Sequence, residues 1–138
     1  MQNLDKHALI NNIRLAMEAV KTAQRSARDA GMVETLDLFS SNKLLSLWSS
    51  AENYSMKQDL TNMQHALSKV KLQLADLTGQ NAFTVELVDL ASDLFLEWNT
   101  DWISLFNLHK IYDIHTKCQT IYTTLEKLLS MVEKEVAR

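Results

Sequence analysis

The sequence predicts an all-α protein, an antiparallel up-and-down four-helix bundle formed by a single domain over residues 1–138. Three observations support this prediction. The chain contains no proline and only two glycines, whereas a β-rich domain of this length would need many tight turns. Hydrophobic residues make up 46% and charged residues 22%, a balance typical of globular proteins. Along most of the chain, apolar residues recur in alternating steps of three and four, which places them on one face of an α-helix.

The first main helix is predicted over 4–30. Gly31 follows it directly, and a glycine suits the left-handed position just past a helix end. The polar side of this helix carries a basic stripe, formed by Arg14, Lys21, Arg25 and Arg28. Its apolar face consists of Leu9, Ile13, Ala16, Val20, Ala23, Ala27 and Ala30.

In two further segments the apolar residues recur with the same regular spacing, which predicts helices over 56–78 and 110–136. Such amphipathic helices are not stable alone in water, so they are expected to bury their apolar faces against one another. Gly79 marks the end of the first of the two. Its apolar face consists of Met56, Leu60, Met63, Leu67, Val70, Leu74 and Leu77. The apolar face of the second consists of Ile111, Ile114, Cys118, Ile121, Leu125, Leu128 and Val132.

The remaining main helix is predicted over 84–108, where apolar residues are densest. Thr84 suits the N-cap, and Glu86 is favourable in the first turn. Extending the apolar face beyond residue 108 reaches mostly polar residues, so a break is predicted near 107–110. One continuous helix through that point is the alternative, because neither glycine nor proline marks the break. The apolar face consists of Val88, Ala91, Phe95, Trp98, Trp102 and Leu105, widened by Leu87, Leu90 and Leu94.

A short extra helix is predicted over 42–54. The apolar residues of this stretch, Trp48 among them, lie on a different face from the one that the 56–78 helix would bury. The alternative is one long helix that buries opposite sides at its two ends, with a second subunit covering the first end. Because tryptophan is enriched at the centres of interfaces, Trp48 is the residue that we expect in an oligomer or partner contact.

An acidic stripe is predicted on the 84–108 helix, where Glu86, Asp89, Asp93 and Glu97 share one face. Carboxylates in such an array can hold Mg²⁺ through waters and a substrate phosphate. The pair Glu86-x-x-Asp89 resembles half of the metal motif of the MazG-like nucleotide pyrophosphohydrolases, which are also helical. That resemblance implies Mg²⁺-dependent nucleotide hydrolysis on this face. The second cluster of the family motif, Glu-Glu-x-x-Glu, has no counterpart in this chain, and charge runs at helical spacing usually face water.

Other polar residues give weaker indications of chemistry. The basic stripe is either a solvated face, a site for an acidic partner or phosphate, or a partner of the acidic stripe on a neighbouring helix. His109 and Asp113 are four residues apart but supply only two of the ligands that a metal site needs. Cys118, the only cysteine, is expected to be a small core residue rather than a nucleophile. We therefore predict no catalytic residue, no metal site and no cofactor.

Composition narrows the classes of partner and the location. A net charge of −3 gives no reason to expect nucleic acid or an anionic membrane as a partner. No run of about 18 apolar residues exists, so no transmembrane helix is expected. The first ten residues lack the continuous apolar stretch of a signal peptide. These features together favour a soluble, cytoplasmic protein.

The function favoured by the sequence is a non-enzymatic helical bundle that binds another protein, as an adaptor, chaperone, immunity or regulatory factor. Self-association, as in a homodimer, belongs to the same class, and helix-in-groove recognition would be its natural mode. One alternative is a Mg²⁺-dependent MazG-like nucleotide hydrolase that uses the acidic stripe. The other is a bundle that holds a small apolar ligand between Phe95, Trp98 and Trp102. A fold of this class does not choose among these functions.

Overall fold

The computed structural model describes residues 2–36, 51–79, 85–98, 101–107 and 110–137. These residues form helices and no strand, which confirms the all-α prediction. The helices are α1 (Gln2–Leu36), α3 (Ala51–Gly79), α4 (Val85–Trp98), α5 (Trp102–Asn107) and α6 (Ile111–Ala137).

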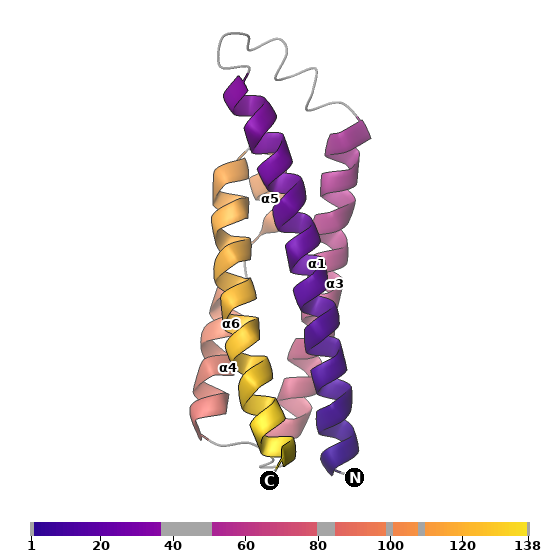
Figure 1. Ribbon diagram of the computed structural model, residues 1–138, viewed down its shortest axis with the longest axis vertical. Coiled ribbons are helices and arrows are strands. Elements are labelled where there is room, and N and C mark those ends of the chain that lie inside the picture. The colour runs from indigo at the N-terminus through magenta and orange to yellow at the C-terminus, as the bar shows by residue number, and fades with distance from the viewer. Residues whose placement is uncertain (1, 37–50, 80–84, 99–100, 108–109, 138) are drawn as a thin grey trace.

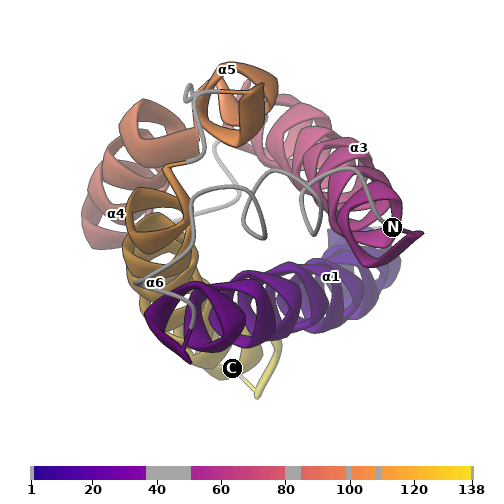
Figure 2. The same cartoon turned by 90° about the horizontal axis from the view of Figure 1, so that it is seen from above.

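α1 runs in one direction along the bundle axis, α3 and α6 run in the opposite direction, and α4 followed by α5 takes the fourth position and returns the chain in the direction of α1 (Figure 1). The beginning of α1 and the end of α6 therefore lie at the same end of the bundle. Seen along the axis, α1 lies between α3 and α6, and the α4–α5 pair lies across from it (Figure 2). Helices that follow one another in sequence are thus neighbours in space, as in an up-and-down bundle.

The three predicted apolar faces on α1, α3 and α6 form the core. Every residue of these faces whose side chain the structure describes is at most 1% exposed. Alanines at 16, 23 and 27 make the α1 face narrow, whereas α3 and α6 contribute mostly leucine, isoleucine and valine. Burying one such large side chain stabilises the fold by roughly 1.5–3 kcal/mol, so this shared core is the main source of stability.

The helix expected over 84–108 is in fact two helices, α4 and α5, and Asp101, which directly precedes α5, is not helical. Asp101 explains the second start, because its side-chain Oδ1 accepts a hydrogen bond from the Ser104 N–H at 3.0 Å. This is an N-cap, and Leu105 N–H then donates to the Asp101 carbonyl at 3.1 Å. Asp101 is a residue type whose short polar side chain competes for backbone hydrogen bonds, and this is the signal that the apolar spacing does not show.

The break also changes which residues are buried. On α4, Leu87 and Ala91 are buried and Val88 is half-buried. On α5, Trp102 and Phe106 are buried, whereas the predicted Leu105 is half-buried. Restarting the helix at Asp101 changes its rotation, so the predicted face holds at Trp102 but continues to Phe106 rather than to Leu105.

The break predicted near 107–110 is confirmed, and the continuous helix through that point is wrong. Lys110 N–H donates to the Leu105 carbonyl at 2.9 Å, a bond over five residues of the kind that closes a helix end. The Lys110 carbonyl in turn accepts from Ile114 N–H at 3.1 Å, which is the first turn of α6. One residue therefore completes the end of α5 and begins α6.

Two other helix boundaries differ from expectation. α1 continues through Gly31 to Leu36, because a glycine inside a helix costs only about 1 kcal/mol and does not by itself end it. α3 begins at Ala51, five residues before the expected start at 56, so residues 51–54 of the predicted extra helix belong to α3. The rest of that predicted helix, with Trp48, lies outside the described residues.

Candidate functional site

A recess of 290 Å³ lies between α1 and α6, and we call it the cationic cleft. Three of the four residues of the predicted basic stripe, Lys21, Arg25 and Arg28, line one side of it. Steps of four and three keep them on one line along α1, next to the buried face that packs against the other helices. The rest of the lining comes from α1 and α6 and consists of Gln24, His115 and Gln119.

A hydrogen bond joins the two walls of the cationic cleft. Gln24 Nε2 donates to Gln119 Oε1 at 2.5 Å. Because Gln119 uses its oxygen in this bond, its amide nitrogen keeps two N–H donors for another group. His115 follows the buried Ile114 on α6 and is half-buried, which places its imidazole at the edge of the helix contact. The α6 side of the cleft therefore adds an imidazole and a side-chain amide to the cations of α1.

The charge of the cationic cleft is one-sided. Lys21, Arg25 and Arg28 are exposed, and no carboxylate whose side chain the structure describes, a set that does not include Asp29, forms an ion pair with them. No carboxylate is among the described side chains that line the cleft either. Like charges three or four residues apart on a helix repel each other by roughly 0.2–0.5 kcal/mol per pair, so an anion bound between Lys21, Arg25 and Arg28 would relieve this repulsion.

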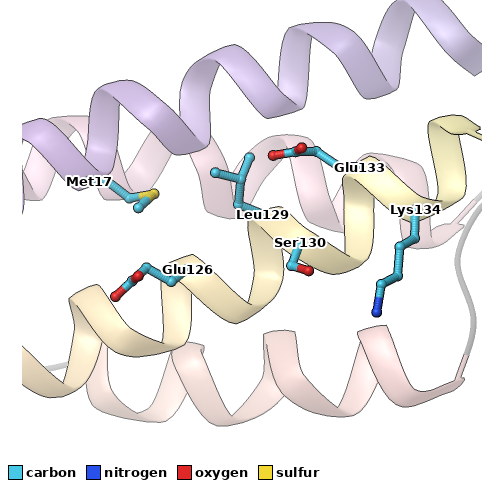
Figure 3. A pocket seen from close by; sticks show the side chains of 6 residues that line it. All are labelled: Met17, Glu126, Leu129, Ser130, Glu133 and Lys134. Carbon is cyan, nitrogen blue, oxygen red and sulfur yellow. The ribbon is translucent and has the colours of Figure 1, made fainter.

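Arg14, the first residue of the basic stripe, has a different environment. Its guanidinium lies 3.7 Å from Glu133 on α6, with both side chains largely exposed. An exposed pair of this kind contributes only about 0–1 kcal/mol. Glu133 also lines a second recess between α1 and α6, of 420 Å³, whose labelled side chains mix both signs of charge with Met17 and Leu129 (Figure 3). Charge of one sign is therefore a property of the cationic cleft and not of the whole α1–α6 boundary.

The acidic stripe does not meet the basic stripe. Glu86, Asp89 and Asp93 are exposed on α4, and the side chain of Glu97 lies outside the described residues. α1 packs against α3 and α6, whereas α4 packs against α6 and α3. Within the described part of the chain no ion pair joins Glu86, Asp89 or Asp93 to the basic stripe, and for Glu97 the pairing stays a prediction.

Among the described residues, no three His, Cys, Asp or Glu side chains gather closely enough to hold a metal ion. His7 and His65 are exposed on separate helices, and His109 lies outside the described residues. Asp113 is exposed on α6. The metal site of the MazG-like interpretation would therefore have three exposed carboxylates on α4. Among the described residues, no second cluster of metal ligands faces them.

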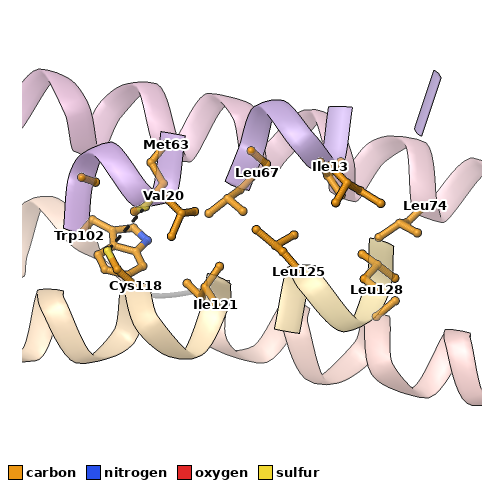
Figure 4. Close-up of a cluster of buried hydrophobic side chains, with 14 of the residues drawn as sticks. Ile13, Val20, Met63, Leu67, Leu74, Trp102, Cys118, Ile121, Leu125 and Leu128 are labelled. Atoms are coloured by element: carbon orange, nitrogen blue, oxygen red, sulfur yellow. Dashed lines mark hydrogen bonds between the residues drawn. The ribbon is translucent and has the colours of Figure 1, made fainter. Parts of the chain in front are cut away.

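Cys118 lies in the core, as expected. It is fully buried on α6, and its Sγ lies 3.9 Å from Met63 Sδ (Figure 4). Burial raises the pKa of the Cys118 thiol to about 12, since the thiolate would lose its hydration. At neutral pH the group is thus a neutral thiol without solvent access, which is the opposite of what a nucleophile needs.

We expect thiol reagents to label Cys118 only through unfolding. Labelling of the native protein at pH 7.5 should be slower than labelling in urea by a factor close to the unfolding equilibrium constant. The raised pKa of the Cys118 thiol also determines how the stability of the fold changes with pH. The thiol is protonated in both states below the unfolded pKa of 9.0, and ionisation favours the unfolded chain as pH rises from there toward 12. Stability of a Cys118→Ala variant should lack this component of alkaline loss. Rapid native labelling would contradict the buried position.

Of the three tryptophans, Trp102 is the one whose side chain the structure describes. Trp102 on α5 is fully buried among the core side chains (Figure 4). Its indole Nε1 is buried without a hydrogen-bond acceptor among the described residues. The side chains of Phe95 and Trp98 and the whole of Trp48 lie outside the described residues, so the predicted aromatic ligand site and the predicted Trp48 interface stay predictions.

Sequence reasoning found the cations of the cleft but not the residues opposite them. His115 and Gln119 are separated from Lys21, Arg25 and Arg28 by about ninety residues, and no local motif connects them. They lie beside the buried positions 114 and 118 of α6, so helical periodicity could have placed them at the border of the packed face. It could not have shown which edge of α6 lies next to α1.

None of the described helices is both long enough and apolar enough to cross a membrane. Comparison with known proteins adds no family to this description: no protein-family model matches the chain, and neither curated proteins nor solved structures give a significant match.

Proposed function

We propose that the chain is a non-enzymatic protein-binding module that docks an anionic segment of its partner at the cationic cleft. The observation that supports this proposal is the gathering of Lys21, Arg25 and Arg28 around one recess where no described side chain is a carboxylate. The net charge of the protein is −3, so this local excess of positive charge marks one face of the molecule that would attract an anionic group. Electrostatic complementarity of this kind steers association and selects among partners.

The size of the cationic cleft argues for one type of recognition over another. Its 290 Å³ lies at the lower limit of ligand sites, which span roughly 300–1,000 Å³. A partner helix is about 10–12 Å wide with its side chains, so a site of this size favours a side-chain-sized group over a whole helix. The helix-in-groove mode expected from the sequence is therefore replaced here by capture of a charged group on an otherwise exposed segment.

The proposal is tested by charge reversal with a matched control. Photo-cross-linkers placed at Thr22, which is exposed on α1, and at Ser68, which is exposed on α3, would identify partners by the face that they touch. Binding of a purified partner would then be measured for Arg25→Glu/Arg28→Glu and for Lys57→Glu/Lys69→Glu. The control pair removes the same charge from exposed positions of α3.

We expect the α1 variant to lose binding by about a hundredfold, since two charge-assisted contacts are each worth roughly a factor of ten, and the α3 variant to retain it. Equal loss in both variants would mean that only net charge matters and would reject the cleft as the docking site. Cross-links that form from Ser68 and not from Thr22 would reject it as well.

A further inference from the structure

We propose that the group bound by the cationic cleft is a phosphate monoester, supplied in the first instance by a phosphorylated side chain of the partner. This inference rests on the proposed function, because it names the chemistry of the anion that the cleft would capture. It is carried by the number, type and placement of the donors around the recess.

The charge of the site matches a dianion better than a carboxylate. Lys21, Arg25 and Arg28 bring three positive charges to one recess, and no carboxylate of the described chain offsets them there. A carboxylate carries one negative charge and two acceptor oxygens, whereas a phosphate monoester carries about −1.5 to −2 charges at neutral pH and three acceptor oxygens. A single carboxylate would leave most of the positive charge of the cleft unbalanced.

The donor types also match phosphate. Each guanidinium presents a planar fork that bonds two phosphate oxygens at once, and a lysine ammonium adds a compact point charge. Arg25 and Arg28 are three residues apart and therefore lie on the same face of α1, with Lys21 one turn before them. Three long cationic side chains on one face of α1 can all bond the same compact tetrahedral group from that side.

The α6 wall of the cleft adds hydrogen-bonding side chains on the side opposite the cations of α1. His115 and Gln119 face the cations across the recess, and the Gln24–Gln119 hydrogen bond leaves the Gln119 amide nitrogen free to donate. Donors from two helices give the site a second side, which separates it from a row of cations on a solvated helix. Lys57 and Lys69 on α3 are also exposed and without an ion pair among the described residues, but they line neither of the recesses described above.

The test uses the full chain and three probes at a constant ionic strength of about 0.15 M, where charges more than about 8 Å apart are screened. The probes are inorganic phosphate, a short peptide with one phosphoserine, and the same peptide with glutamate at that position. Binding is followed by isothermal titration calorimetry and by nuclear magnetic resonance of the Arg25 and Arg28 Nε–H groups and the His115 ring.

We expect saturable binding of inorganic phosphate and of the phosphopeptide, with resonance changes confined to the residues of the cleft. Arg25→Gln/Arg28→Gln should weaken binding by about tenfold or more, and the matched control Lys57→Gln/Lys69→Gln should bind within about twofold of the unchanged chain. Because all four side chains are exposed, both variants should give the spectrum of a folded protein.

Three outcomes would overturn the phosphate proposal: no saturation, equal weakening in the variant and its control, or a glutamate peptide that binds as tightly as the phosphopeptide. The source of the phosphate follows from the first two probes. A phosphopeptide that binds more tightly than inorganic phosphate indicates a protein partner, whereas equal affinities support a phosphate site that takes a free phosphate compound.

The same experiment separates this inference from the proposed function. Binding of a partner that depends on Arg25 and Arg28 but is not matched by any phosphate probe would retain the protein-binding module and reject the phosphate. Phosphate binding without any partner cross-linked from Thr22 would retain the site and reject the module.

Discussion

Replacing Leu67 by alanine is expected to cost about 2–5 kcal/mol of the free energy of unfolding, the usual range for a leucine removed from a packed core. Leu67 lies in the middle of α3 and is fully buried. Its truncation removes apolar area from the core and leaves a cavity that the surrounding helices can fill only in part, because they are held by contacts along their whole length. Urea unfolding followed by circular dichroism at 222 nm measures the change.

Leu72 provides the matched control, because it is five residues further along the same helix and 72% exposed. Leu72→Ala should change the free energy of unfolding by less than about 0.5 kcal/mol, as surface substitutions usually do. The same chemical change at two places on one helix then isolates burial from helix propensity, which is identical for the two substitutions. A comparable loss at both positions would mean that α3 does not bury the face that the structure assigns to it.

This pair of leucines also shows why most of the fold could be predicted from the sequence. Leu67 belongs to a run of apolar residues in steps of three and four, and Leu72 falls outside it. Solvent divides a helix into two faces, so this spacing determines which side is buried before any neighbouring helix is known. The buried faces of α1, α3 and α6 follow from that rule alone.

Periodicity fails where a helix ends and a new one starts. The gap between α4 and α5 comes from a local contest in which the Asp101 side chain bonds the Ser104 N–H. No apolar spacing records such a contest, and after the restart the buried face of α5 keeps the predicted Trp102 but takes Phe106 in place of Leu105. Gly31 shows the opposite error, since a residue with a known preference for helix ends lies inside α1. Boundary signals are worth only about 1 kcal/mol each, and tertiary packing outweighs them.

Of the candidate site, the α1 wall could be predicted from the sequence and the α6 wall could not. Lys21, Arg25 and Arg28 lie on one helix, so their alignment follows from spacing. Their meeting with His115 and Gln119 depends on the rotation and axial position of α6 against α1, and those are set by the packing of the whole core. The sequence therefore indicated a basic stripe but not that a second wall turns part of it into a cleft.

Truncation of Trp102 is the second substitution with a large expected effect. Trp102→Ala should cost about 3–5 kcal/mol, because it removes one of the largest fully buried side chains from the core. α5 is only six residues long, and Trp102 is one of its two buried residues. A helix of that length has no stability of its own in water, so its position depends on this anchor. Loss of the anchor should expose the adjacent end of the core to hydrogen exchange before the rest.

Trp102→Phe tests the unusual polar atom in that anchor. The indole Nε1–H is buried without an acceptor among the described residues, and an unsatisfied buried donor costs roughly 1–3 kcal/mol. Phenylalanine removes this donor while keeping an aromatic ring, so the gain offsets much of the lost packing. We expect Trp102→Phe to cost no more than about 1.5 kcal/mol, well below the alanine variant. A phenylalanine variant as unstable as the alanine variant would mean that the N–H is bonded in solution, and hydrogen exchange of the Trp102 indole N–H would then be strongly protected. A small loss would instead identify volume as the property that position 102 must supply, because α5 would keep its place without the polar atom.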